Sequence, residues 1–275
     1  MNCHIEFYFQ NTSRKLNLRL PYQECNMESL FVLLDELNDL HGKKEMSRVA
    51  EYIDILALKR PMPDVHPLQE ANNEYFPGLT AKAWYEAEDF EWNAAMRAQS
   101  SEILRELTEL AAQDTRFSPY EDPGSKDLGW PGWEIYPLYD PLGYTKGSAR
   151  CPKTVAALKN AGHGPRQGMF SRVRPGAHIQ PHSGPVNYFL TCHLALVVPP
   201  DCGIRVGDEM RHWREGEALV FDDSFVHEVW NHDQEERIVL IWDIWHPDLT
   251  VEEIAAIQKI QQVKRGQPRQ IAQTA

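Results

Sequence analysis

Two kinds of hydrophobic periodicity divide the sequence into a helical part and a strand-rich part. In the first 112 residues, apolar side chains recur at helical spacing. Asn26 is a candidate N-cap for a helix that Gly42 ends, a second helix ends before Pro61, and a third covers about residues 87–112. From about residue 167 to residue 246, short apolar runs alternate with turn residues, which is typical of β-strands.

The strand-rich part predicts the fold class. The expected strands are Gly168–Arg174, Tyr188–Val198, Ile204–Val206, Ala218–Phe221 and Arg237–Trp245. Many short strands with Pro- and Gly-containing turns between them predict a mainly β core, either a sandwich or a jelly roll. Thr250 and Glu253 match a capping box, which predicts a C-terminal helix after that core.

These patterns divide the chain into successive parts. Residues 1–65 are expected to form an accessory N-terminal subdomain of a hairpin plus helices. Residues 66–165 are expected to form a helical and loop lead-in to the barrel, with loops and short strands over residues 116–165. Residues 166–248 are expected to form the β core, and residues 249–275 a helix and tail. The N-terminal subdomain is expected to pack against the barrel; a homodimer face, a substrate lid and a partner-docking module are the alternatives.

Charge and composition restrict the partners. The chain has 275 residues, with 28 basic and 40 acidic side chains and a net charge of −12. This charge disfavours nucleic acids and anionic membrane surfaces, so neither is expected as a partner. No apolar run approaches the ~20 residues of a membrane span, and the first residues do not resemble a secretory signal. An odd number of cysteines without a CxxC motif argues against a disulfide framework, and we therefore predict a cytoplasmic protein.

Two histidines stand at the ends of predicted strands. His182 follows a Pro-Gly turn and a strand, and His227 lies in FDDSFVHEVW between two strands. Neutral imidazoles at the mouth of a jelly roll can bind a divalent first-row metal. The usual carboxylate ligand two residues after the first histidine is absent, because Gly184 occupies that position. Asp222 or Asp223 is then either a distant third ligand or, as we expect, a residue that forms the turn and orients the histidine.

A basic and polar set accompanies these histidines. Arg237 lies on the strand after His227, and Ser171 and His193 lie on strands that flank His182. If Arg237 points into the barrel, a bound dicarboxylate is its natural partner, because a carboxylate fits the guanidinium fork. If Arg237 is exposed, an ordinary ion pair with a surface acid explains it equally well.

Three motifs together carry a family resemblance. PHSGP, FDDSFVHEVW and D-x-W-H-P resemble the aspartyl/asparaginyl β-hydroxylase family over about residues 74–255, most densely between Gly168 and Thr250. The resemblance implies a double-stranded β-helix (a cupin-like jelly roll) with a helical N-terminal region and a C-terminal helix. It also implies an oxygenase that depends on iron(II), 2-oxoglutarate as co-substrate, and O2.

The resemblance assigns roles by motif. It implies that His182 and His227 are the iron ligands, and that Gly184 leaves a coordination position open, as is usual in this family. Ser171 and Arg237 match residues that hold the distal carboxylate of 2-oxoglutarate. His193 matches a residue near the carboxylate next to the keto group.

The substrate is less well determined. The family holds an acidic substrate with strand arginines, and the matching strand Tyr188–Cys192 has none. Arg172, Arg174 and Tyr139 are the remaining substrate-binding candidates. We expect hydroxylation of an aliphatic C–H, at the β-carbon of an Asp- or Asn-like unit in a free amino acid, a peptide or a biosynthetic intermediate. Two alternatives stay open: a halogenase with chloride in the Gly184 gap, and a non-catalytic cupin that binds a small anion.

Overall fold

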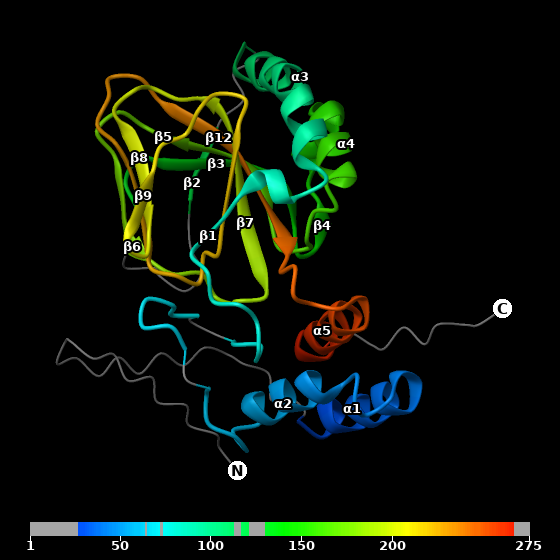
Figure 1. The fold of residues 1–275 in the computed structure, drawn as a ribbon. Helices are drawn as coiled ribbons and strands as arrows, with labels where there is room; N and C mark the ends of the chain where they lie inside the picture. Colours follow the sequence, from blue (N-terminus) through cyan, green and yellow to red (C-terminus); the bar gives the residue numbers. More distant parts are fainter. Residues whose placement is uncertain (1–26, 64, 72–73, 113–116, 121–129, 267–275) are drawn as a thin grey trace.

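Two β-sheets face each other at the centre of the protein (Figure 1). The structure is a computed structural model that describes residues 27–63, 65–71, 74–112, 117–120 and 130–266. Within these residues the large sheet has eight strands, the small sheet has four, and the ladders between named strands are antiparallel. The predicted mainly β core, a double-stranded β-helix of the jelly-roll type, is confirmed.

The large sheet is built around two strands that are buried on both faces. Its order is β1 (Trp84–Tyr85), β10 (Ala218–Phe221), β7 (Phe189–Val197), β12 (Arg237–Trp245), β5 (Gly168–Val173), β3 (Trp133–Asp140) and β2 (Ser118–Pro119), and β4 (Gly143–Tyr144) also pairs with β3. The central β7 and β12 are nearly continuous apolar runs. Such runs fit strands with packed side chains on both faces, here helices outside and the barrel interior inside.

The small sheet brings the two candidate metal ligands together. Its order is β6 (His178–His182), β11 (His227–Asn231), β8 (Cys202–Val206) and β9 (Glu209–Arg211). Burial alternates along β11, as expected for a strand with one face toward the barrel interior. In the β6–β11 ladder, His227 lies directly opposite His182.

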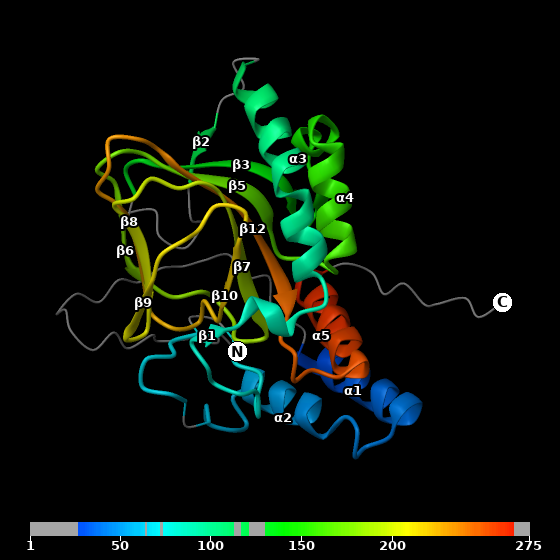
Figure 2. The same cartoon turned by 45° about the horizontal axis from the view of Figure 1, so that its top comes forward.

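Helices cover the large sheet and one end of the barrel (Figure 2). The short helix η1 (Ala87–Asp89) precedes α3 (Asn93–Ala112), and η2 (Lys146–Arg150) precedes α4 (Pro152–Asn160). The apolar faces of α3 and α4 pack on the outer face of the large sheet, in a cluster that includes Leu107, Leu158 and Trp242. Helices α1 (Met27–His41), α2 (Ser47–Leu56) and α5 (Val251–Lys264) pack together around Ile257 at the end of the barrel.

Most of the helix boundaries follow the sequence signals. Gly42 adopts a φ of +94° directly after α1, a backbone conformation that favours glycine. The capping box at the start of α5 is confirmed, because Thr250 Oγ1 accepts from Glu253 N and Glu253 Oε2 accepts from Thr250 N. The candidate N-cap Asn26 and the hairpin expected near residues 4–20 lie outside the described residues.

The expectation of only loops and short strands over residues 116–165 is wrong, because α4 lies in that segment. Pro152 stands at its first turn, but its nine residues are too few to give a clear periodic pattern. The same lead-in also supplies β1 and β3 to the large sheet. The barrel therefore draws on residues before 166, because β3 pairs with β5 and β1 pairs with β10. No helix in the described part of the chain is long and apolar enough to cross a membrane.

Candidate active site

The two histidine rings lie side by side at the mouth of the barrel. The centroids of His182 and His227 are 4.2 Å apart. His182 Nδ1 lies 2.8 Å from the carbonyl oxygen of Gln180, and His227 Nδ1 lies 2.9 Å from that of Phe225. A carbonyl only accepts, so both Nδ1 atoms carry the proton and both Nε2 atoms carry the lone pair. The pair is therefore oriented to present Nε2 as the metal-ligating atom.

Burial keeps His227 neutral. Burial of His227 is the largest cause of a pKa well below the ordinary value, and the nearby His182 lowers the pKa further. Neutral imidazole is the form that binds a metal. The ring of Trp130 lies 5.0 Å from that of His182 and covers it from the side of the lead-in segment.

A neighbouring carboxylate fills the space beside Gly184. A Cβ added at Gly184 would lie 2.5 Å from Cγ and Oδ1 of Asp223, so the close approach requires glycine. Asp223 Oδ2 pairs with Arg166 Nη1 at 2.9 Å, and Oδ1 is buried without a hydrogen-bond partner among the described residues. Within the described ranges no group of three or more His, Cys, Asp or Glu side chains is arranged to hold a metal. The structure thus offers two imidazoles, with an acid standing next to the position that lacks a ligand.

Asp222 holds the turn before His227, which is the turn-forming part of the role expected for this pair of aspartates. Its Oδ1 accepts from the backbone N of Ser224 at 2.9 Å and from the Ser224 hydroxyl at 2.5 Å. Its Oδ2 accepts from Gln69 Nε2 at 3.0 Å. Burial raises the pKa of Asp222 to about 7.

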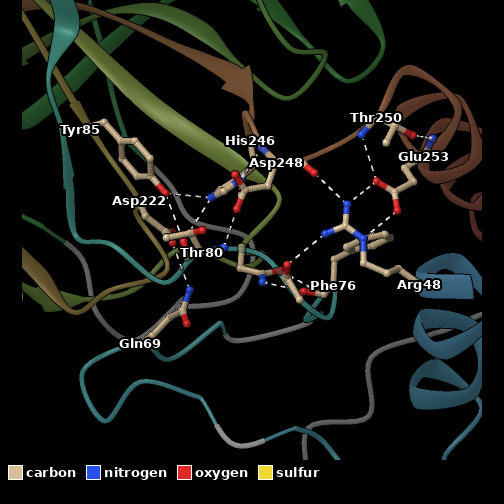
Figure 3. Close-up of polar contacts among 12 residues, drawn as sticks. Arg48, Gln69, Phe76, Thr80, Tyr85, Asp222, His246, Asp248, Thr250 and Glu253 are labelled. Atoms are coloured by element: carbon tan, nitrogen blue, oxygen red, sulfur yellow. Dashed lines mark hydrogen bonds and ion pairs between the residues drawn. The ribbon is translucent and has the colours of Figure 1, made fainter. Parts of the chain in front are cut away.

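A further polar network ties this turn to the helical end of the molecule (Figure 3). Beyond Asp222, Tyr85 Oη and His246 Nε2 lie 2.8 Å apart, and Asp248 Oδ2 accepts from Thr80 N at 2.8 Å. Arg48 of α2 donates to the carbonyl of Asp248 at 2.7 Å. The histidine of the D-x-W-H-P motif therefore supports the barrel rim and does not join the histidine pair.

Arg237 points into the barrel and has no acidic partner among the residues that the structure describes. Its side chain is 1% exposed, it stands 4.8 Å over the ring of Trp213, and it forms no ion pair with any side chain that the structure describes. Nη1 reaches the carbonyl of Ser171 at 3.4 Å, and Nε is buried without a partner among the described atoms. Burial lowers the pKa of Arg237 to about 10. A buried cation without a counter-ion is unfavourable, so the site is suited to a bound anion.

Ser171 and His193 share this interior with Arg237. The Ser171 hydroxyl accepts from Trp133 Nε1 at 3.0 Å. His193 lies edge-on to Phe221, and its Nδ1 is buried without a partner in the described part of the chain. Burial is the main cause of the lowered pKa of His193, and Arg237 and His227 lower it further. An unpaired guanidinium, an unpaired imidazole nitrogen and the neighbouring histidine pair fit a metal ion chelated by a dicarboxylate.

The three substrate-binding candidates do not join this group. Arg172 pairs with Glu134 at 2.5 Å and Arg174 pairs with Glu134 at 2.8 Å. The two guanidiniums lower the pKa of Glu134 although its partial burial opposes them. Side chains alternate along β5, so Arg172 points away from the interior that Ser171 faces. Tyr139 packs in the outer core and stacks on His163 at 4.1 Å.

The structure adds residues that sequence reasoning missed. Trp130 and Trp133 come from the loop-rich lead-in and cover the histidine side of the barrel. Arg166, between α4 and β5, reaches both Asp223 and Thr191. An isolated arginine in a loop follows no periodic pattern, so only the folded chain shows where it points.

Comparisons with known proteins fit this architecture. The family model described as aspartyl/asparaginyl beta-hydroxylase matches residues 97–247. The mouse aspartyl/asparaginyl beta-hydroxylase is 32% identical over 193 residues, which is 66% of this chain and 26% of that protein. The ornithine lipid ester-linked acyl 2-hydroxylase of Rhizobium tropici is 33% identical over 176 residues, covering 59% of this chain and 60% of that protein.

A solved structure also aligns with part of the chain. It is a prolyl hydroxylase from Trichoplax adhaerens in complex with a hypoxia inducible factor peptide, with a TM-score of 0.40 and 13% identity over 54% of this chain and 78% of that one. Fold and paired histidines together define a cupin-like jelly-roll protein. Within that class, the chain belongs to the aspartyl/asparaginyl β-hydroxylase family. It spans about a quarter of the length of the mouse relative.

Proposed function

We propose that this protein is an iron(II)- and 2-oxoglutarate-dependent hydroxylase that acts on an aliphatic C–H bond. The observation that carries the proposal is Arg237, which is buried without an acidic partner in the described part of the chain. It shares its interior with two histidine rings that lie 4.2 Å apart. A dicarboxylate is the ligand that satisfies both features, because one carboxylate can pair with the guanidinium while the other reaches a metal on the histidines.

The protein's own residues bind, orient and exclude water. His182 and His227 would hold iron(II) through Nε2, since their Nδ1 atoms contact backbone carbonyls. Arg237 and Ser171 would hold the distal carboxylate of 2-oxoglutarate, and His193 would donate to the carboxylate near the metal. Iron(II), when bound, supplies the oxygen activation that amino-acid side chains cannot provide.

The substrate we propose carries a CH2 group next to a carboxyl-type carbon. The mouse relative is named for the β-carbon of aspartyl and asparaginyl residues, and the Rhizobium relative for C2 of an ester-linked acyl chain. In both cases the named position is adjacent to a carboxyl, amide or ester carbon. An Asp- or Asn-like unit, free, in a peptide or in a biosynthetic intermediate, is the first candidate.

The geometry argues against the halogenase alternative. The carboxylate of Asp223, which pairs with Arg166, occupies the space beside Gly184 that a chloride ligand would need. A non-catalytic cupin that binds an anion would show no turnover, so a turnover assay tests that alternative.

The experiment is a turnover assay with iron(II), 2-oxoglutarate and O2. The panel contains aspartate, asparagine, peptides with either residue, and acyl esters, with and without chloride. We expect succinate formation coupled to a product heavier by one oxygen atom, lost in His182→Ala and unchanged in Arg105→Gln, whose side chain is exposed on α3. A chlorinated product would establish the halogenase, and no 2-oxoglutarate consumption across the panel would favour the anion-binding cupin.

A further inference from the structure

The indole of Trp213 contacts two of the groups that we propose to hold 2-oxoglutarate. The guanidinium carbon of Arg237 lies 4.8 Å from the centre of the Trp213 ring. The imidazole of His193 also stacks on Trp213, with centroids 6.0 Å apart and ring planes 18° from parallel. Trp213 is 5% exposed and packs in a cluster that takes residues from both sheets. A side chain that lies between β9 and β10 therefore adjoins both Arg237 and His193.

The chain on both sides of Trp213 is fixed by hydrogen bonds to neighbouring strands. His212 Nδ1 lies 2.8 Å from the carbonyl oxygen of Cys202 on β8. After Trp213 the chain turns at Gly216, whose φ is +78° and whose N donates to the carbonyl of Ala195 on β7 at 2.9 Å. The backbone around Trp213 is thus tied to one strand of each sheet, which holds its ring in the barrel interior.

The guanidinium of Arg237 has little else to fix its position. Among the described residues, its hydrogen bond to the carbonyl of Ser171 is 3.4 Å long, and its Nε has no partner. A hydrogen bond of that length is weak, and a long arginine side chain loses much conformational freedom when it is fixed. An aromatic face attracts a guanidinium most strongly where water is excluded. Within the described part of the chain, the face of Trp213 is therefore the main contact that orients this guanidinium.

The choice of tryptophan indicates that the ring face matters more than its N–H group. Trp213 Nε1 is buried without a hydrogen-bond partner among the described residues, which is unfavourable for a donor. Phenylalanine at this position would avoid that cost, but tryptophan offers the stronger face for a cation. The residue type therefore fits a contact with the Arg237 guanidinium.

We infer that Trp213 is a positioning residue, whose ring holds the guanidinium of Arg237 where the distal carboxylate of 2-oxoglutarate binds. The inference rests on the proposed function, because 2-oxoglutarate is the ligand that Arg237 would anchor. Trp213 then acts through Arg237 and needs no contact with the co-substrate. A guanidinium that is already oriented loses less conformational freedom on binding, so the ring raises the affinity for 2-oxoglutarate.

The test is a double-mutant cycle on 2-oxoglutarate binding, measured by isothermal titration of the full chain loaded with Mn(II) in the absence of O2. Trp213→Leu removes the ring, and Trp213→Phe keeps a smaller aromatic face. Each is made alone and together with Arg237→Met. Trp92→Phe is the control, because Trp92 Nε1 is also buried without a described partner, but its ring packs on Trp242 in the outer cluster. Circular dichroism confirms folding.

The effect of each Trp213 substitution should depend on Arg237. With Arg237 present, Trp213→Leu should weaken 2-oxoglutarate binding about 5- to 30-fold, and Trp213→Phe about threefold, in the range for a desolvated cation–π contact. Together with Arg237→Met, either substitution should change the affinity by less than about twofold, because the group that Trp213 positions is gone. Trp92→Phe should bind 2-oxoglutarate like the wild type.

Equal losses of affinity with and without Arg237 would show that Trp213 only supports the fold, and would overturn the inference. Equal losses in Trp213→Leu and Trp213→Phe would assign the effect to the Nε1 group and would overturn it as well. If Trp213→Leu does not fold, the cycle with Trp213→Phe decides. Failure of the wild type loaded with Mn(II) to bind 2-oxoglutarate would instead contradict the proposed function.

Discussion

Two polar networks, one half-buried and one buried, differ in how completely their atoms are paired. At the helical end (Figure 3), Arg48 donates from all three guanidinium nitrogens, to Glu253 at 2.8 Å, to the carbonyl of Gly78 at 3.0 Å and to that of Asp248 at 2.7 Å. In the barrel interior, Arg237 Nε, His193 Nδ1 and Asp223 Oδ1 have no partners among the described residues.

The difference separates a structural network from a binding site. An unpaired buried polar atom costs free energy, and a protein that only needed stability would gain by pairing it or replacing it. Arg48 joins α2 to the start of α5 and satisfies its neighbours. Arg237 has no acidic partner among the described residues, so a bound anion would stabilise it.

The largest effect should follow removal of a metal ligand. Changing His182 or His227 to Ala removes one of the two imidazoles that we propose as metal ligands, and succinate formation should be abolished. Affinity for Mn(II) should fall at least about 100-fold, more than the loss usually caused by removing an outer partner of a ligand. Metal titration followed by activity assay checks this, with Arg105→Gln as the control. Retained turnover would show that the ligand assignment is incorrect.

Asp222 belongs to the paired network and gives the pH test. Its pKa is raised to about 7 by burial, while in the unfolded chain it ionises near the ordinary value of about 4. Between these pH values the folded state holds a proton that the unfolded state has lost. Stability due to Asp222 therefore falls as pH rises from about 4 to 7, then stays constant.

The matched variant for this test is Asp222→Asn, which cannot ionise. The difference in free energy of unfolding, wild type minus variant, should decrease by up to about 4 kcal/mol over that pH range. Urea unfolding of the metal-free proteins at several pH values measures it. A difference that does not change with pH would mean that Asp222 titrates normally in the folded state.

Arg237→Met should affect the ligand more than the fold. Loss of a charge-assisted anchor should weaken 2-oxoglutarate binding by about 1.5–3 kcal/mol. Stability of the metal-free protein should be kept or increased, because an uncompensated buried charge is removed. Isothermal titration and thermal unfolding measure the two quantities. Unchanged affinity for 2-oxoglutarate would refute the anchoring role.

Arg48→Met should affect the stability of the fold more than ligand binding. The variant leaves Glu253 without its guanidinium partner, so we expect a loss of about 1–2 kcal/mol in stability. Affinity for 2-oxoglutarate should not change, since the hydrogen-bond partners of Arg48 are Glu253, Gly78 and Asp248, outside the barrel interior. A stability loss in Arg237→Met and none in Arg48→Met would reverse the comparison on which the site assignment depends.

The sequence predicts the fold better than it predicts which residues surround the histidine pair. Buried strands such as β7 and β12 are long apolar runs, and the capping box before α5 is local, so both can be recognised without a structure. Opposite placement of His182 and His227 requires strand pairing between segments 45 residues apart, which only the family motifs could suggest. Helix α4 is too short for a clear period.

The arginines near the barrel mouth show most clearly what cannot be predicted from the sequence. Arg172 and Arg174 attract notice because they are charged residues on a strand next to Ser171, but alternation and Glu134 direct them outward. Arg166 has no pattern around it and still reaches the barrel mouth, because Asp243 and Thr191 fix its backbone and side chain. Tertiary contacts decide such cases.

The central claim is that the histidine pair and Arg237 together bind iron(II) and 2-oxoglutarate. Anaerobic addition of both to the purified protein, followed by visible absorption spectroscopy, tests it directly. The weak charge-transfer band of 2-oxoglutarate chelated to iron(II) should be present in wild type, absent in His182→Ala and reduced in Arg237→Ala at limiting 2-oxoglutarate. Absence of the band in wild-type protein saturated with iron(II) and 2-oxoglutarate would contradict the account.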